Sequence, residues 1–308
     1  MIDYLLRRLL GLIPVVLGVA TLTFMLIHLV PGDPVVAMLG DSAQPADIVA
    51  MRHQLGLDQP LVTQYGAFLG GLVRGDLGES ITMRAPVRRV IAERYPATLE
   101  LAAAGLFVAV LIAFPLGLIA GANPGGITDA SAMGVAVLGI SIPHIYLGPL
   151  LMIVFSLELR SLPLTGRGGI AHLVLPAITL GFSMAAILAR MLRQSLLGAR
   201  HAEYMRTAIG KGLSPVAALI RHALRNALMP VITLLGLEAG ALLTGSIIVE
   251  TIFSWPGLGR LMITAINNRD YPLVEGCVLT FALSYVVVNL ITDLAYGTVD
   301  PRVRLTSR

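Results

Sequence analysis

Long runs of apolar residues dominate this 308-residue chain. A helix needs roughly 20 mainly apolar residues to cover the hydrocarbon core of a bilayer, which is about 30 Å thick. In lipid every backbone polar group must be satisfied within its segment, and these runs are too long for barrel strands of about ten alternating residues. We therefore predict an all-α, polytopic membrane protein with six transmembrane helices. They cover Leu9–Val30, Thr98–Gly121, Ala130–Leu157, His172–Met191, Ala227–Val249 and Leu273–Tyr296.

The composition excludes several classes of soluble protein. Charged residues make up 13% of the chain and hydrophobic residues 56%, whereas an ordinary soluble domain is roughly one quarter charged. Disorder and a typical soluble enzyme are thereby excluded. The 22 basic residues are spread along the chain, which argues against a nucleic-acid partner. The lone Cys277 permits no internal disulfide framework and is expected to be a small buried side chain.

Arginine placement predicts the orientation of the chain. Basic residues gather in the first tail, with Arg7 and Arg8, in the loop between the fourth and fifth spans, and in the last tail. Cytoplasmic loops carry such an excess, and loops longer than about 60 residues largely escape the rule. Both termini should therefore be cytoplasmic. The first run is longer than the apolar region of a signal peptide, so we expect it to be retained.

The long loop after the first span should be external and helical. Apolar residues recur at helical spacing over Ala46–Leu55 and Leu61–Val73, and a coil of this length would be unusual. The segment before the last span reads as a turn, Ser254–Arg260, and a short amphipathic helix. It is either a re-entrant element or an interfacial anchor, and Trp255 suits an interface.

The loop between the fourth and fifth spans is predicted to form two short amphipathic helices. The first lies within Ala199–Gly212, with Gly212 as its stop. The second starts at Ser214-Pro215, where Ser is a good N-cap and Pro suits the first helical position. Two such helices could be a docking platform for another protein or a hairpin on anionic lipid. Spacing alone does not separate the two.

Sequence motifs for catalysis or metal binding are weak. Gly210-Lys211-Gly212 lacks the Ser or Thr of a phosphate-binding loop, and the histidines show no metal-ligand spacing. An intramembrane serine protease would need an activated serine and a histidine. Ser141 with His144, or Ser183, are the candidates, but the sequence around Ser183 lacks the second glycine of the expected turn.

Glu238 is the acidic residue in the middle of the fifth span, and Asp293 lies near the end of the sixth. Charge at membrane depth is costly, so such groups usually face the bundle interior or a wet cavity. Gly236 and Gly240 flank Glu238 as a pair that permits close helix packing. Glu238 either lines a solute path or makes an interhelical hydrogen bond.

Several motifs, in order along the chain, resemble one family of transport proteins. They are Tyr4–Leu10 with Pro31–Pro34, Leu55–Pro60, Gly75–Gly78, Tyr204–Ala208, Lys211-Gly212, Arg221–Asn226, Met229-Pro230, Phe253–Gly259, Arg269–Pro272 and Asp300–Arg304. Together they resemble the inner-membrane permeases of bacterial ABC importers, in the peptide, nickel and glutathione group. The resemblance implies three parts: residues 1–30 with the first helix, an external helical loop at 31–97, and a transmembrane domain at 98–308.

The resemblance also implies partners and a mechanism. The loop after the fourth span would couple to an ATPase through Glu203, Met205, Arg206, Thr207, Ala208 and Gly212, although the acidic residue and first alanine of the family motif are replaced. Partners would be a second homologous permease, two ATP-binding subunits that hold ATP and Mg, an external solute-binding protein and the lipid bilayer. This chain would then be no enzyme and bind no cofactor. A self-contained secondary transporter or channel is the alternative, and the sequence leaves the solute open.

Overall fold

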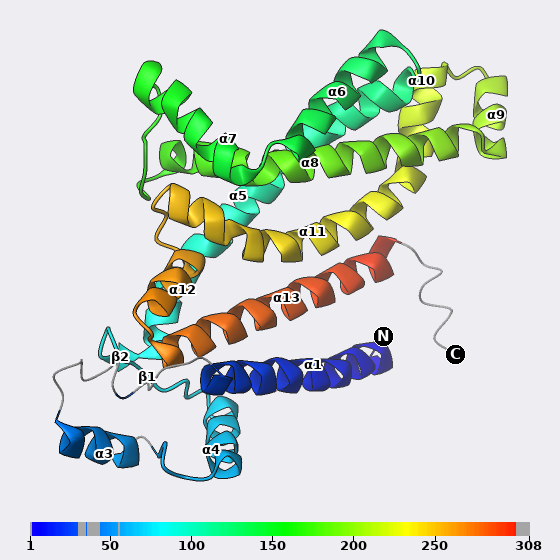
Figure 1. The fold of residues 1–308 in the computed structure, drawn as a ribbon. Helices are drawn as coiled ribbons and strands as arrows, with labels where there is room; N and C mark the ends of the chain where they lie inside the picture. The colour runs from blue at the N-terminus through cyan, green and yellow to red at the C-terminus, as the bar shows by residue number, and fades with distance from the viewer. Residues whose placement is uncertain (1, 30–34, 36–43, 55, 300–308) are drawn as a thin grey trace. The chain divides into compact units, whose positions relative to one another are not determined.

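The computed structural model describes residues 2–29, 35, 44–54 and 56–299, and these are almost entirely helical (Figure 1). The chain divides into two compact units. The first unit takes in Thr98–Trp255 and the chain from Tyr285 onward, and the second takes in Ile2–Ala97 and Pro256–Ser284. The motif residues 31–34, 55 and 300–304, and the C-terminal tail used to predict orientation, lie outside the described residues. The division at residues 30 and 97 stays a prediction.

Among the described residues, four helical segments are long and apolar enough to cross a membrane. They are α5 (Val87–Ala122), α8 (Ile170–Arg200), the continuous segment Pro215–Ile252 and α13 (Tyr271–Val299). The first predicted span lies in α1 (Ile2–Leu29), whose described apolar part is Ile13–Met25. The all-α membrane fold is confirmed, and the number six stays a prediction.

The third predicted span is wrong as a single helix. Its residues form α6 (Ile127–Ser141), then α7 (His144–Leu151) continued by the π-helix η1 (Met152–Glu158), with a bend of 104° between the two arms. Ile142 is extended, with φ −95° and ψ 109°, and Pro143 follows it. Proline disfavours helical backbone in the residue before it and offers no N–H to continue the helix. The break therefore follows from Pro143.

Two further boundaries differ from the prediction. Helix α8 extends to Arg200, so Arg190 and Arg193 are helical and not part of a loop. The predicted second short helix begins as expected with Ser214 as N-cap, but α10 (Pro215–Ala218), the π-helix η2 (Leu219–Ala223) and α11 (Leu224–Ile252) follow one another without a gap. The second helix and the fifth span are therefore one segment.

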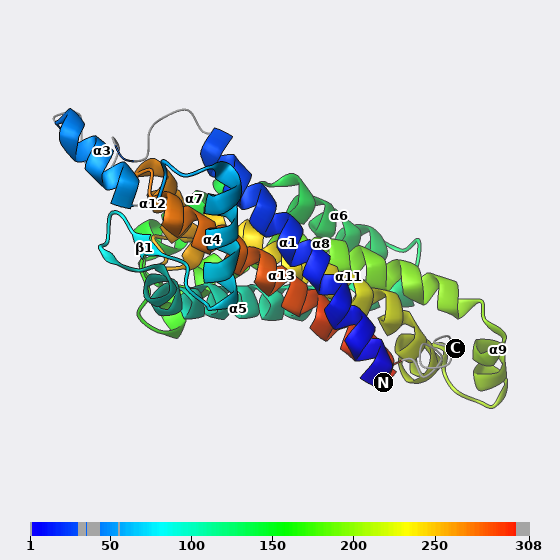
Figure 2. The ribbon, with the colours of Figure 1, turned by 90° about the horizontal axis from the view of Figure 1, so that it is seen from below.

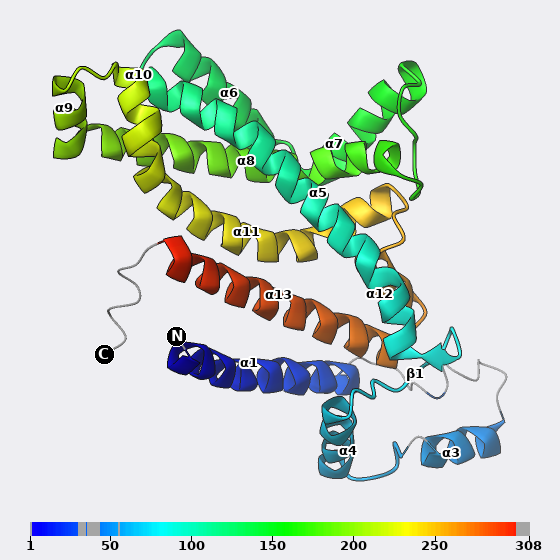
Figure 3. The same ribbon diagram turned by 180° about the vertical axis from the view of Figure 1, so that it is seen from behind.

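Helix α8 is the centre of the first unit and packs against α6 and α11 (Figure 3). Its buried side chains recur at helical spacing, at Leu175, Leu180, Met184, Leu188, Leu192 and Leu196. Two glycines of α5 lie against this row: a Cβ at Gly117 would be 2.9 Å from the Leu192 Cβ, and one at Gly121 2.7 Å from the Leu196 Cδ1. Close approach of α5 and α8 requires glycine there.

The second unit has its own apolar core. It joins the start of α5, helix α12 (Leu258–Asn267) and the start of α13 around Val87, Val90, Ile91, Leu258, Leu261, Ala265, Leu273 and Cys277. Cys277 is thus a buried core residue, as predicted. A short hairpin of β1 (Glu79–Ser80) and β2 (Ala85–Pro86) precedes α5.

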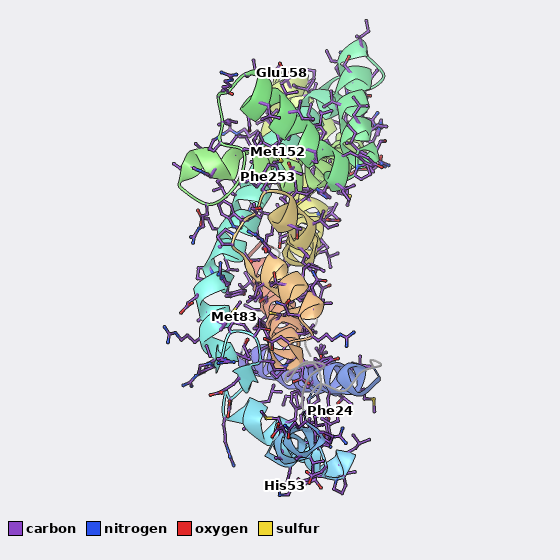
Figure 4. All side chains as sticks on the ribbon, turned by 60° about the vertical axis from the view of Figure 1, so that its left-hand side comes forward. Phe24, His53, Met83, Met152, Glu158 and Phe253 are labelled. Atoms are coloured by element: carbon purple, nitrogen blue, oxygen red, sulfur yellow. The ribbon has the colours of Figure 1, made fainter. Side chains whose placement is uncertain are left out.

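The long segment after α1 contains the two expected helices, α3 (Pro45–Gln54) and α4 (Leu61–Val73). In the same unit α4 contacts α1: the Tyr65 hydroxyl lies 2.6 Å from the Thr21 hydroxyl, and the Phe24 ring centroid 5.3 Å from that of Tyr65. Phe24 is labelled in Figure 4.

Trp255 does not lie at an exposed interface. It belongs to the first unit, is fully buried, and has the Arg167 guanidinium 6.0 Å from its ring centroid. It follows a turn in which its N–H donates to the Glu250 carbonyl, next to Phe253, which Figure 4 labels. Trp255 is therefore a core residue that fixes the end of α11.

Candidate functional site: the segment after α8 and the cavity beside α11

Helix α9 (Glu203–Gly210) is a short element beyond the end of α8 (Figures 1 and 2). Ala202 precedes it with extended backbone, and the Met205 N–H donates to the Ala202 carbonyl at 3.0 Å. Glu203 lies in its first turn, where the helix dipole favours an acid. The Thr207 hydroxyl donates to the Glu203 carbonyl at 3.1 Å. The start of α9 is thus determined by contacts among residues close together in the sequence.

Gly212 ends this element through its backbone conformation. Its φ is +95°, which side-chain-bearing residues rarely adopt. The Gly212 N–H donates to the Ile209 carbonyl at 2.9 Å, and the Leu213 N–H to the Ala208 carbonyl at 3.3 Å. These two bonds are the pattern of a Schellman C-cap. The predicted stop at Gly212 is confirmed, and its cause is the left-handed backbone of this glycine.

The predicted coupling residues lie on two different faces of α9. Met205 and Ala208 are 2% and 6% exposed, and α9 packs against α10 and η2. Buried Ala218, Leu219 and Ala223 belong to these two partners. Glu203, Arg206 and Thr207 are exposed, together with Tyr204 and Ile209. One face therefore fixes the helix to its base, and the other is open to a partner.

The base of α9 includes a π-helical turn. In η2 the residues Leu219 and Ala223 are buried, whereas Ile220, Arg221 and His222 are exposed. π-helical turns inside longer helices are rare and frequently lie at functional sites. On the amino side the Ser214 hydroxyl accepts from the Ala217 N–H at 3.3 Å. The N-capped helix α10 and the π-helix η2 thus connect α9 to α11.

An apolar cavity of about 410 Å³ lies between α8 and α11. Its lining consists of Met191, Met229, Pro230, Thr233, Leu234 and Leu237. Glu238 lies one helical turn beyond Leu234 and outside this lining, with a partly exposed side chain. Gly236 and Gly240 pack on the opposite side, where Thr292 and Tyr285 of α13 lie. The predicted close packing at these glycines is confirmed.

Two contacts of the first unit were not found by sequence reasoning. The Arg193 guanidinium of α8 holds the Asp129 carboxylate of α6 by two bonds, of 2.6 and 2.7 Å. The Asp129 carboxylate also accepts from the Gly125 N–H at 2.8 Å. Asp129 in the first turn of a helix was the available signal, but its partner is 64 residues away.

A serine and a histidine do meet in the first unit. The Ser183 hydroxyl lies 3.2 Å from the His144 Nε2, and the His144 Nδ1 lies 2.7 Å from the Thr179 carbonyl. A carbonyl at Nδ1 makes that nitrogen the donor and leaves Nε2 to accept from Ser183. Ser141, by contrast, donates to the Val137 carbonyl. The His144 ring thus ties the broken segment α6–α7 to α8.

The residues that the structure describes contain no group of three or more His, Cys, Asp or Glu side chains able to hold a metal ion. Asp129 is instead engaged by Arg193, as described above, and Glu250 by hydroxyl groups. Thus the Thr98 hydroxyl donates to the buried Glu250 carboxylate at 2.7 Å. The arrangement consists of packed helices, one exposed short helix and an apolar cavity.

Two family models match the chain. A model of binding-protein-dependent transport system inner membrane components matches residues 113–305, and a model of the N-terminal part of such membrane components matches residues 1–102. Glutathione transport system permease protein GsiC of Salmonella paratyphi A is 43% identical over 304 residues, covering 99% of both chains. The GsiC protein of Escherichia coli strain K12 is 42% identical over the same length.

Solved structures agree on the fold. The MetNI methionine ABC transporter in an inward-facing conformation aligns with a TM-score of 0.56 at 17% identity, covering 68% of this chain and 96% of that one. An amino acid ABC transporter aligns with a TM-score of 0.54 at 15% identity, covering 68% and 94%. The family models and the GsiC relatives are transport components, and they overturn the alternative of an intramembrane serine protease.

Proposed function

We propose that this chain, which belongs to the family of binding-protein-dependent transport system inner membrane components, forms half of a translocation pathway for peptides or a related small solute. The chain is a permease subunit of an ATP-driven importer in the bacterial inner membrane. Glutathione, a tripeptide, is the first solute to test, because glutathione permeases 42–43% identical to this chain match it over nearly its full length. Full-length identity at this level is the observation that carries the proposal.

The importer needs further subunits. Two ATP-binding subunits would hold ATP and Mg, because this chain lacks a phosphate-binding loop of its own. A second, homologous permease would complete the pathway, and an external solute-binding protein would deliver the solute. Both termini would be cytoplasmic, as the basic residues of the tails and of the segment after α8 indicate.

Helix α9 is proposed to be the element that the ATPase grips. Its exposed residues Glu203, Arg206 and Thr207 would contact the partner, while buried Met205 and Ala208 transmit the movement to η2. From η2 the movement would enter α11 directly, because Pro215–Ile252 has no gap. A docked helix passes on force only when it is packed against what it moves.

Glu238 is proposed to line the solute path. It lies on the side of α11 away from the Gly236 and Gly240 contacts with α13, and near the cavity at Leu234. Glu238→Gln keeps the size and removes the charge, so we expect at least a threefold change in the KM or rate of uptake. Unchanged uptake for every solute tested would reject the role. The control Thr251→Val alters an exposed polar residue of the same helix.

Reconstitution tests the proposal as a whole. The chain is purified with its ATPase subunits and second permease, placed in liposomes, and supplied with the solute-binding protein and either glutathione or dipeptides. We expect uptake only when ATP is present on the side of the membrane that carries the ATPase subunits and the binding protein is present on the other side. Uphill transport by the isolated chain would instead support a secondary transporter, and passive flux a channel.

A further inference from the structure

Two exposed turns of the second unit meet at one buried carboxylate. Asp270, 0% exposed, accepts hydrogen bonds from the Ser80 hydroxyl at 2.5 Å, the Ile81 N–H at 3.1 Å and the Thr82 N–H at 3.0 Å. The Leu273 N–H donates to the same carboxylate at 3.3 Å. Asp270 thereby binds the turn of the β1–β2 hairpin to the link between α12 and α13.

The hairpin turn is fixed in a single conformation. The Met83 N–H donates to the Ser80 hydroxyl at 3.0 Å, and the Arg84 N–H to the Ser80 carbonyl at 2.9 Å. Every backbone N–H from Ile81 to Arg84 therefore has an acceptor within the unit. A turn whose donors are satisfied internally is ordered before any partner arrives, which lowers the entropy cost of binding.

Both turns hold an arginine in a left-handed conformation. The φ of Arg84 is +49° and that of Arg269 is +54°. Arg269 takes the position at the end of α12 that glycine usually takes, since its N–H donates to the Ile266 carbonyl and the Asp270 N–H to the Ala265 carbonyl. Glycine would satisfy both positions without strain. Retained backbone strain is concentrated at functional sites, so the arginine side chains call for a role.

These arginines are accompanied by exposed apolar residues. Arg84 and Arg269 are exposed, Met83 is 39% exposed and Ile266 49% exposed. Met83 is labelled on the hairpin turn in Figure 4. Arginine and methionine are enriched in protein interfaces, where charged residues steer association. The four residues Met83, Arg84, Ile266 and Arg269 are called the Asp270 platform below.

We propose that the Asp270 platform is the surface on which the external solute-binding protein docks, through an acidic rim of that protein that faces Arg84 and Arg269. This inference rests on the proposed function, which supplies the external position of residues 31–97 and the dependence on a binding protein. Two observations favour this occupant: the positive charge of both turns, and the description of the matched family as components of binding-protein-dependent transport systems.

Glycine variants test the platform without disturbing its backbone. Arg84→Gly and Arg269→Gly together remove both charges and relieve both left-handed positions, so the protein should be at least as stable. With the reconstituted importer, we expect the concentration of binding protein that half-maximally stimulates ATP hydrolysis to rise roughly tenfold. The maximal rate and the basal rate should stay the same.

The matched control is Arg74→Gly, in the same unit. Arg74 is exposed and has an ordinary right-handed backbone, with φ −85°. It should leave the half-maximal concentration unchanged, while Arg84→Glu with Arg269→Glu should raise it further. Higher salt should weaken docking of the wild-type complex more than that of the double glycine variant.

The outcomes separate the two proposals. An unchanged half-maximal concentration in the double glycine variant, or an equal rise in the Arg74 control, would overturn the platform and leave the importer function standing. A wild-type complex whose ATP hydrolysis and uptake ignore the binding protein at every concentration would overturn both.

Discussion

At the scale of single residues, Gly212 carries the sharpest constraint. A Cβ at this position would meet nothing within 4 Å, yet φ is +95°, so the demand comes from the backbone and not from space. A left-handed backbone costs a side-chain-bearing residue about 1–2 kcal/mol, and least for asparagine. We expect Gly212→Val to raise the ATP hydrolysed per solute imported severalfold, and Gly212→Asn to change it by less than twofold. Equal ratios for the two variants would contradict the backbone argument.

Gly240 presents the opposite case, in which space decides. A Cβ there would lie 2.6 Å from the Tyr285 Cδ2, whereas a Cβ at Gly245 of the same helix would meet its nearest neighbour, Leu180, at 4.0 Å. Overpacking costs about 1–3 kcal/mol, while glycine to alanine in a helix otherwise stabilises by about 0.5–1 kcal/mol. Thermal unfolding in detergent should show Gly240→Ala destabilised and Gly245→Ala unchanged or stabilised. The reverse order would refute close packing of α11 on α13.

At the scale of elements, the two faces of α9 should respond differently to substitution. Met205→Ala empties a buried position and should cost about 2 kcal/mol or more locally, which hydrogen exchange of the α9 amides would detect as faster exchange. Arg206→Glu alters the exposed face and should leave exchange unchanged. Its effect should instead be fewer ATPase subunits copurified with the permease. If Arg206→Glu loosened α9 and retained the ATPase, the assignment of the faces would be wrong.

Elements specified by local sequence could be predicted. Ser214-Pro215 marked a helix start, Gly212 a stop, and apolar spacing marked α3 and α4, because caps and periodicity act within a few residues. The bend between α6 and α7 was missed although Pro143 was visible, since hydropathy averaged over a long run does not register one proline. The joining of α10 to α11 was missed, although no Gly or Pro between Pro215 and Pro230 interrupts the helix.

At the scale of the whole chain, contacts distant in sequence could not be predicted. His144 finds Thr179, Asp129 finds Arg193 and Asp270 finds Ser80 only after the helices are placed. A single sequence does not show which polar groups far apart in the chain will pair. Membership of the family, in contrast, was evident from short motifs in order, because each motif is specific when its neighbours are also present.

The Asp129–Arg193 ion pair should hold α6 on α8. Asp129 is 4% exposed, so removing its charge leaves the Arg193 guanidinium without its bidentate partner and should weaken the packing of α6 on α8, less so because Arg193 partly reaches solvent. Asp129→Asn should therefore lower the midpoint of thermal unfolding in detergent by several degrees. The control Asp76→Asn changes an exposed acid in the second unit and should shift it little. A shift as large in the control would contradict the assigned importance of the pair.

The length of α8 has a consequence for the choice of lipid. Its 31 residues span about 46 Å at 1.5 Å per residue, roughly 15 Å more than the hydrocarbon core. If that excess lies on the side of α9, it passes the headgroup layer of about 5–7 Å and places the short helix roughly one Debye length, about 8 Å in physiological salt, beyond the headgroups. Enriching liposomes in phosphatidylglycerol, an anionic lipid, should then barely alter the affinity of the ATP-binding subunits for the permease.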